Sequence, residues 1–142
     1  MTDDRPPADG DEACERIETP YFTGVRYRDR VELTIQCRQL TDDDNLNDFG
    51  ESLMNVCTHE KACRVLIDVA QLEFVTSSLL ARFIQLQRTT RREGGRVVLA
   101  SPGENFRDVL EVTNLDDFFE VTKTVDEARQ ALARESSPER ES

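Results

Sequence analysis

Two short apolar runs constrain the fold of this chain more than any other feature of its sequence. They are RVLIDV at residues 64–69 and GGRVVLA at residues 94–100. Short, nearly continuous apolar runs are typical of strands that are covered on both faces of a sheet. The 24 residues between them are enough for a crossover helix. Strand, helix and strand predict a βαβ unit with a parallel strand pair and a right-handed connection.

The segment between the two runs has the pattern of an amphipathic helix. Ser77 stands where a helix N-cap is expected, and Gly94 with Gly95 would end the helix. Apolar side chains that cover one side of this helix are Leu79, Leu80, Phe83, Ile84 and Leu86.

Two segments before this unit are rich in β-branched and aromatic residues, YFTGVRYR at 21–28 and RVELTIQC at 30–37. The polar turn around Asp29 between them predicts a β-hairpin. TDDD at 41–44 then offers N-caps and first-turn acids for a second amphipathic helix. Its apolar residues, at spacings of three and four, are Leu46, Phe49, Leu53, Met54 and Cys57.

Two later helices are predicted from capping-box spacing. Ser101 is followed by Glu104, and Thr124 is followed by Glu127, with apolar residues at helical spacing after each pair. FFEV at 118–121, between these helices, predicts a short last strand. The complete order is β-β-α-β-α-β-α-β-α, which predicts an α/β fold: a mixed β-sheet with helices packed on it.

The ends of the chain differ in composition from its middle. Residues 1–19 hold two prolines, a glycine and seven acids with almost no large apolar side chain. Such a segment cannot bury enough surface to offset the entropy of ordering it. Residues 134–142 are equally polar. We therefore expect one domain at 20–133 between disordered tails at 1–19 and 134–142.

Charge and hydropathy exclude several classes of function. The chain has 18 basic and 29 acidic residues, a formal net charge of −11 that would repel nucleic acid. No stretch approaches the roughly 18 to 20 consecutive apolar residues of a membrane helix, and the acidic N-terminus does not resemble a signal peptide. We expect a cytoplasmic protein with reduced cysteines, no insertion into membranes, and a protein or small-ligand partner.

Three features could suggest a metal, a catalytic or a nucleotide site. His59 stands between Cys57 and Cys63, but no second cluster supplies further ligands, so we expect no metal. Asp68 ends a buried-type strand, yet no nucleophile–base pair of recognised spacing accompanies it. The glycines of residues 94–103 do not form a phosphate-binding motif. We expect neither enzymatic activity nor a cofactor.

The stretch FVTSSLLARF at 74–83 places three successive hydroxyl residues at a helix start. One hydroxyl suffices for an N-cap, which is worth about 1 kcal/mol. Three exceed that need, and a helix N-terminus beside the end of a strand is an exposed place where partners dock. Capping alone and a docking or regulatory role are the two interpretations of this stretch.

The element order, with the segment 65–121, resembles the STAS domain of bacterial anti-sigma-factor antagonists, and the likeness covers roughly residues 20–133. That family has a loop reading Phe-hydrophobic-Asp-Ser-Ser-Gly-Leu, in which a partner kinase phosphorylates the first Ser. Phe74 and Val75 match this loop, while Thr76 stands where the family often has Asp and Leu79 where it has Gly. Ser77 falls on the phosphorylated Ser and Ser78 on the second Ser.

The resemblance implies a regulatory protein-interaction module that binds a serine kinase acting as an anti-sigma factor. Phosphorylation is expected at Ser77, with Thr76 and Ser78 as alternates, and Asp68 is expected to support the loop. The expected partner-binding residues are Thr76, Ser77, Ser78, Leu79 and Leu80. Relatives of this family also act as scaffolds of the stressosome type, assembled with other STAS chains, or as accessory proteins in lipid transport, without a phosphorylation switch.

Overall fold

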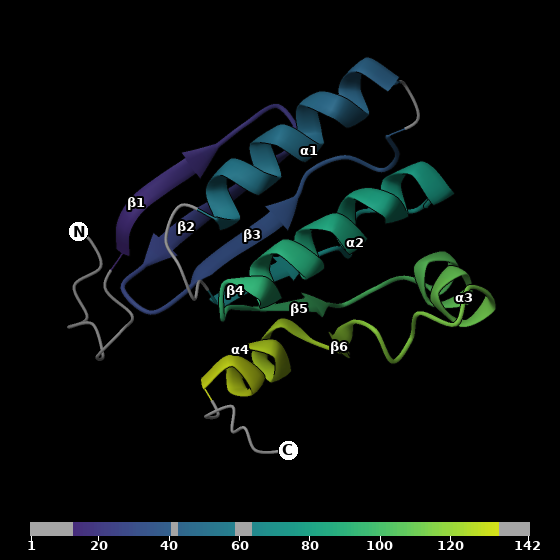
Figure 1. The fold of residues 1–142 in the computed structure, drawn as a ribbon. Coiled ribbons are helices and arrows are strands. Elements are labelled where there is room, and N and C mark those ends of the chain that lie inside the picture. Colours follow the sequence, from purple (N-terminus) through teal and green to yellow (C-terminus); the bar gives the residue numbers. More distant parts are fainter. Residues whose placement is uncertain (1–12, 41–42, 59–63, 134–142) are drawn as a thin grey trace.

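A mixed β-sheet organises the chain (Figure 1). The computed structural model describes residues 13–40, 43–58 and 64–133. The first three strands are antiparallel neighbours, and the third to the sixth run parallel. In spatial order, which is also chain order, the six described strands are β1 (Ala13–Glu18), β2 (Phe22–Tyr27), β3 (Val31–Ile35), β4 (Arg64–Asp68), β5 (Arg96–Ala100) and β6 (Glu120–Thr122).

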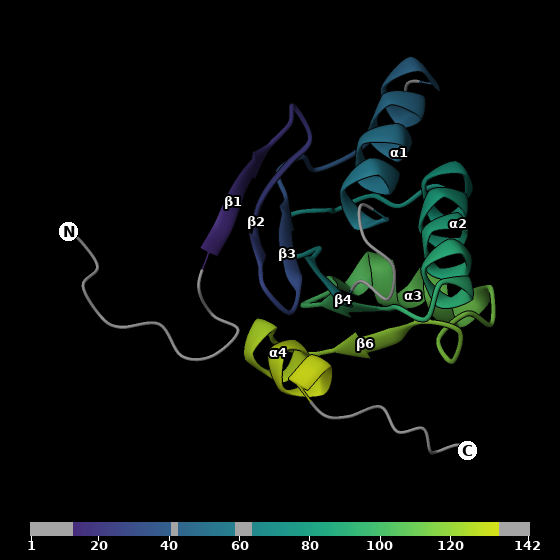
Figure 2. The ribbon, with the colours of Figure 1, turned by 60° about the vertical axis from the view of Figure 1, so that its left-hand side comes forward.

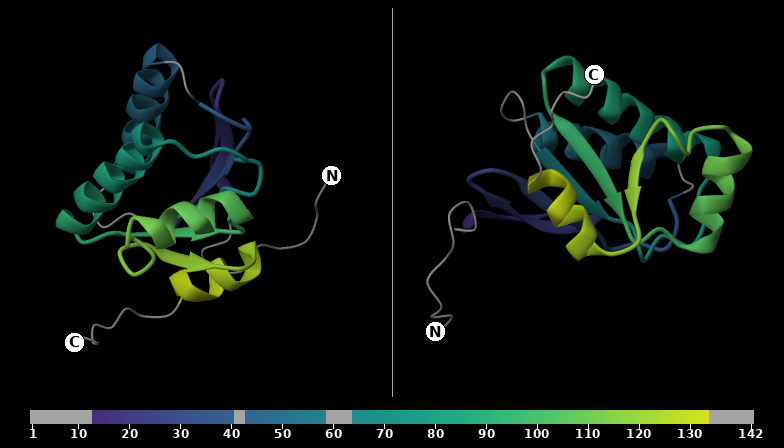
Figure 3. Two further views of the ribbon diagram at one scale, coloured as in Figure 1. Left: turned by 90° about the vertical axis from the view of Figure 1, so that its right-hand side faces the viewer. Right: turned by 90° about the horizontal axis from the view of Figure 1, so that it is seen from below.

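Helices cover both faces of the sheet. α1 (Asp43–Cys57), α2 (Ser77–Arg92) and α3 (Glu104–Val112) connect the parallel strands, and α4 (Val125–Ala133) follows β6. α1 and α2 lie side by side on one face, and α4 lies on the opposite face (Figures 2 and 3). Because β3, β4 and β5 run parallel and each is followed by a helix, the loops that lead to α1, α2 and α3 all leave the sheet at the carboxyl ends of these strands.

A row of buried phenylalanines joins the main core beneath α1, α2 and α3. Phe49 of α1 contacts Phe22 of β2 edge-on, with ring centroids 6.1 Å apart, and Phe83 of α2 at 6.0 Å. Phe83 in turn contacts Phe106 of α3 at 5.9 Å. All four side chains are at most 1% exposed. Because aromatic rings bury large areas and pack with specific geometry, this row fixes α2 between its neighbours.

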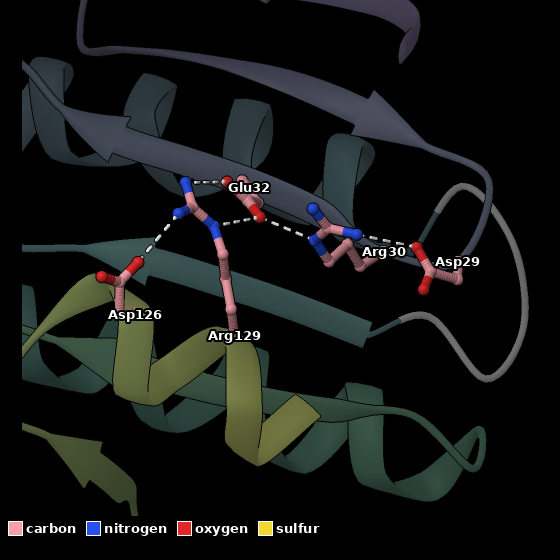
Figure 4. Close-up of polar contacts among 5 residues, drawn as sticks. All are labelled: Asp29, Arg30, Glu32, Asp126 and Arg129. Atoms are coloured by element: carbon pink, nitrogen blue, oxygen red, sulfur yellow. Dashed lines mark hydrogen bonds and ion pairs between the residues drawn. The ribbon is translucent and has the colours of Figure 1, made fainter. Parts of the chain in front are cut away.

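A small apolar cluster and an arginine–glutamate ion pair hold helix α4 on the sheet. Its Ala128, Ala131 and Leu132 pack with residues of β4 and β5. The Glu32 carboxylate accepts hydrogen bonds from Arg129 Nε at 2.9 Å and from Arg30 Nε at 2.6 Å (Figure 4). Burial alone would raise the pKa of Glu32, but the hydrogen bonds and charges of these two arginines outweigh it and lower that pKa.

The predicted α/β architecture is confirmed, and the hairpin, the last short strand and all four helices lie where they are expected. One strand differs from the prediction. Residues 13–18, assigned from composition to a disordered tail, form β1 and pair antiparallel with β2. Ile17 is 8% exposed, and Glu15 forms an ion pair with Arg26 at 3.1 Å. The buried side chain of Ile17 and the ladder hydrogen bonds to β2 order this edge strand despite its polar sequence. Thr19, the last residue of the predicted tail, is also described, and its Oγ1 accepts hydrogen bonds from the backbone N–H groups of Tyr21 and Phe22. Residues 1–12 and 134–142 lie outside the described residues.

One of the two predicted capping boxes is wrong. Helix α3 begins at Glu104 after Gly103, and its N-cap position has no side-chain hydrogen bond. Ser101 instead adopts a positive φ of 58° and donates its backbone N–H to Thr122 O. At the start of α4 the predicted cap by Thr124 is right, since the Glu127 backbone N–H donates to Thr124 Oγ1 at 3.1 Å. The Glu127 side chain accepts from the backbone N–H of Lys123 at 3.1 Å, one residue before the position that a capping box uses.

Candidate functional site

The loop that leads from β4 to α2 is ordered from its first residue. Asp68 is the last residue of β4, and its Oδ1 accepts a hydrogen bond from the backbone N–H of Ala70 at 3.0 Å. The backbone N–H of Val69 donates to Ala100 O of β5, also at 3.0 Å. Leu72 is 1% exposed and anchors the middle of the loop in the core. Asp68 therefore contacts the loop that it is expected to support.

Two neighbouring segments hold the second half of this loop. The carbonyl oxygen of Arg38, after β3, accepts from the backbone N–H groups of Glu73 at 2.8 Å and Phe74 at 3.2 Å. The two side chains also form an exposed ion pair, Arg38 Nη2 to Glu73 Oε1 at 2.8 Å. On the other side, Asn105 Oδ1 of α3 accepts from the Val75 N–H at 3.1 Å. Hydrogen bonds thus hold the loop to the segment after β3 on one side and to the start of α3 on the other.

The hydrogen bond from Arg38 lowers the pKa of Glu73 and raises the pKa of Arg38. Both side chains are solvent-exposed, so this pair positions the loop more than it stabilises the domain.

Thr76, and not Ser77, is the N-cap of α2. Thr76 has extended backbone angles of φ −94° and ψ 165°, and its Oγ1 accepts from the backbone N–H of Leu79 at 3.1 Å. Its carbonyl oxygen accepts the first helical hydrogen bond, from the Leu80 N–H at 2.9 Å. Ser77 is the first residue of the helix. The predicted cap at Ser77 is therefore wrong by one residue, and the Ser77 hydroxyl has no capping role.

The five residues from Phe74 to Ser78, named the rim from here on, are at least partly accessible to solvent. Ser77 and Ser78 are exposed, and Phe74 is 53% exposed. Val75 and Thr76 are half-buried. An exposed phenylalanine beside two exposed hydroxyls combines an apolar anchor with groups that can be modified.

Leu79 and Leu80 do not belong to this surface. Their side chains are 0% and 3% exposed and lie in the main core. Their expected role as partner-binding residues is wrong, because a helix start that packs on the sheet turns these two leucines inward. Phe74 is the surface residue that the reading of the hydroxyls missed. The sequence holds no signal for it, since a phenylalanine before a helix reads equally well as a core residue.

The remaining candidate positions are those of the cysteine–histidine cluster. Cys57 is fully buried in α1, as its place in the apolar stripe predicted. His59 and Cys63, the other members of the cysteine–histidine cluster, lie outside the described residues. None of the described helices has the length and apolar character that crossing a membrane requires.

Comparison with known proteins relates this fold to one family. The family model of the STAS domain matches residues 25–128. An anti-sigma-factor antagonist (STAS) domain protein from Planctomyces limnophilus superposes with a TM-score of 0.68 at 20% identity, over 74% of this chain and 92% of that one. An anti-sigma factor antagonist from Mycobacterium paratuberculosis also gives a TM-score of 0.68, at 17% identity, over 83% and 100%. At these identities the structural likeness establishes the fold.

Proposed function

This chain belongs to the STAS domain family, and we propose that it is a regulatory protein-interaction module of the anti-sigma-factor-antagonist type. In this proposal the rim binds a serine kinase that also acts as an anti-sigma factor. Phosphorylation of Ser77 by that kinase releases the complex. The role is non-catalytic, and the partner is a protein.

The observation that carries the proposal is the freedom of the Ser77 hydroxyl. Because Thr76 caps α2, Ser77 is exposed at the first helical position without a structural task. Phosphorylation there would break no capping hydrogen bond. Phe74, three residues before it, offers the apolar contact on which protein interfaces depend. Hydrogen bonds from the loop to Arg38 and Asn105 hold these groups in one arrangement, so little ordering entropy would be lost on binding.

Phosphorylation at Ser77 would act on binding far more than on folding. It adds about −1.5 to −2 charges and three acceptor oxygens. At the start of α2 this charge would be tolerated, with a gain of roughly 0.3 to 1 kcal/mol from the helix dipole. In a docked interface the same charge must be desolvated, at a cost of several kcal/mol unless it is paired. The desolvation cost in the interface exceeds the gain from the helix dipole. The dissociation constant of the complex should therefore rise tens-fold or more.

The experiment begins with intact-mass analysis and site mapping of the protein from its native cells. The Ser77→Ala variant then serves as bait for the partner, which is identified by mass spectrometry, purified and titrated. Gln85→Glu is a matched control, because it adds a negative charge to an exposed position on the same helix, two turns from Ser77.

We expect Ser77→Ala and Gln85→Glu to bind like the unmodified chain and Ser77→Asp to bind at least tenfold more weakly. Phe74→Ala should weaken binding without changing the fold. Equal affinity of the Ala and Asp variants at Ser77 would remove the switch from this position.

A further inference from the structure

Arg82 of α2 is a partly buried cation without a matching anion among the residues that the structure describes. Its side chain lies across α1, where the absence of a side chain at Gly50 makes room: a Cβ on Gly50 would come within 3.1 Å of Arg82 Cδ. Arg82 Nη2 donates to the neutral amide oxygen of Asn47. Its Nε is buried without a hydrogen-bond partner, and no carboxylate of the described residues forms an ion pair with it. A buried guanidinium N–H without an acceptor costs free energy in the folded state. An anion placed at this site would therefore stabilise the domain.

Ser78 is the rim residue that lies closest to Arg82 along the helix. The two are four residues apart in α2, and side chains at this spacing are neighbours on the same face. Helical side chains lean towards the N-terminus, so a side chain at position 82 can reach back towards position 78, on the side of α2 from which Arg82 contacts Asn47 and Gly50 of α1. Ser77 has Leu80 and Ala81 at the corresponding spacings of three and four, and neither is a cation. Helix spacing therefore places a negative group on Ser78 within reach of Arg82 and leaves the same group on Ser77 without a cation one turn along.

We propose that Ser78 is a second phosphoacceptor, whose phosphate is retained within the chain by Arg82, whereas a phosphate on Ser77 is presented to the partner. The modification is a transfer of the γ-phosphoryl group of a nucleoside triphosphate. A bond forms between Ser78 Oγ and the phosphorus as the bond to the bridging oxygen breaks. The hydroxyl proton passes to a base of the kinase, and the nucleoside diphosphate leaves.

The retained phosphate would link two helices. Arginine binds phosphate through parallel N–H donors, and the first-turn N–H groups of α2 favour the same charge. Because Arg82 also holds Asn47, the phosphate on Ser78 would tie the start of α2 to α1. The rim would then be stiffened, with about half to two thirds of its new charge neutralised by the single positive charge of Arg82. Modification of Ser78 should accordingly stabilise the domain and impair partner binding less than modification of Ser77.

This inference rests on the proposed function only for the existence of a kinase, because the contact itself lies within one chain. It is tested on the full chain carrying phosphoserine incorporated at position 78 or, as the matched control, at position 77. Phosphorus NMR titration gives the second pKa of each phosphoserine, whose ordinary value is about 6. Each protein is also prepared with Arg82→Gln and with Arg82→Lys, and thermal unfolding and circular dichroism are recorded for all of them.

We expect the phosphoserine pKa at position 78 to lie about 0.5 to 1 unit below that at position 77, because a nearby cation favours the dianion. The melting temperature should also be higher for the chain phosphorylated at 78. Arg82→Gln should abolish both differences, and Arg82→Lys should keep part of the pKa difference even if one variant is less stable.

Equal pKa values at the two positions would overturn the inference. So would a difference that survives Arg82→Gln, because the helix N-terminus alone would then explain it. Neither outcome bears on partner release by phosphorylated Ser77, so the two proposals fail separately.

Discussion

Thr76→Ala should destabilise the domain, and Ser77→Ala should not. In Thr76→Ala the backbone N–H of Leu79 loses its acceptor, which lies at 3.1 Å in the structure. Replacing an N-cap hydroxyl by Ala costs about 0.5 to 2 kcal/mol, typically about 1 kcal/mol. For a domain of this size, that corresponds to a fall in melting temperature of about 4 °C.

Ser77→Ala removes an exposed hydroxyl with no capping role, so its stability should change by less than about 0.5 kcal/mol. Ser77→Asp should be neutral or slightly stabilising, because a carboxylate in the first turn suits the helix dipole.

The assay is urea unfolding followed by far-UV circular dichroism, with thermal unfolding as a second measure. Thr76→Ser and Thr76→Asp are the matched controls, because both side chains keep an oxygen acceptor at the cap. They should retain the stability that Thr76→Ala loses. A loss of stability in Ser77→Ala as large as that in Thr76→Ala would refute the assignment of the cap and return it to Ser77.

Three further predictions concern the scaffold. Because the pKa of Glu32 is lowered in the folded state, its contribution to stability is present above about pH 4 and is lost as the pH falls through the folded pKa. Glu32→Gln, which weakens the bond to Arg129, should therefore be less stable than the parent chain by about 1 kcal/mol at pH 7, and by less at pH 3, in urea titrations. Gly24→Ala should cost about 1 to 3 kcal/mol, because its Cβ would lie 2.3 Å from Glu32 O; an unchanged urea midpoint would contradict this. Deleting residues 1–12 should leave the melting temperature within about 2 °C, whereas deleting 1–18 removes β1 and should lower it by more than about 4 °C.

The architecture was predictable from the sequence because its signals are local and repeated. Continuous apolar runs identified β4 and β5, and spacings of three and four identified α1 and α2. Strand β1 gave no such signal, since Ile17 is the only large apolar side chain among its six residues. An edge strand of this kind is stabilised by pairing with β2, which no local pattern in the sequence contains. The polar composition of these residues therefore led to a predicted domain start at residue 20, whereas β1 already begins at Ala13.

The position of the helix start was not predictable for a related reason. Thr76, Ser77 and Ser78 are all good N-caps, so local preference does not choose among them. The choice is made by tertiary packing: Leu79 and Leu80 must both face the core, and this rotation of the helix puts Thr76 at the cap. The same rotation exposes the two serines. The exposure of Phe74 likewise depends on the loop being tied back to residue 38, a contact between segments that are 35 residues apart.

The order of residues at this helix start separates the groups that the fold requires from the two exposed serines. Thr76 satisfies the helix backbone and Leu79 fixes the helix on the core, so the structural requirements are met on either side of the two serines. Both serines are exposed, and the helix dipole favours a negative charge at both positions. The two hydroxyls differ in what lies one turn further along α2: Ala81 beyond Ser77, and Arg82 beyond Ser78. In our proposal, adjacent serines on one helix carry the same modification with different consequences, because the helix repeat directs one phosphate towards solvent and the other towards a cation.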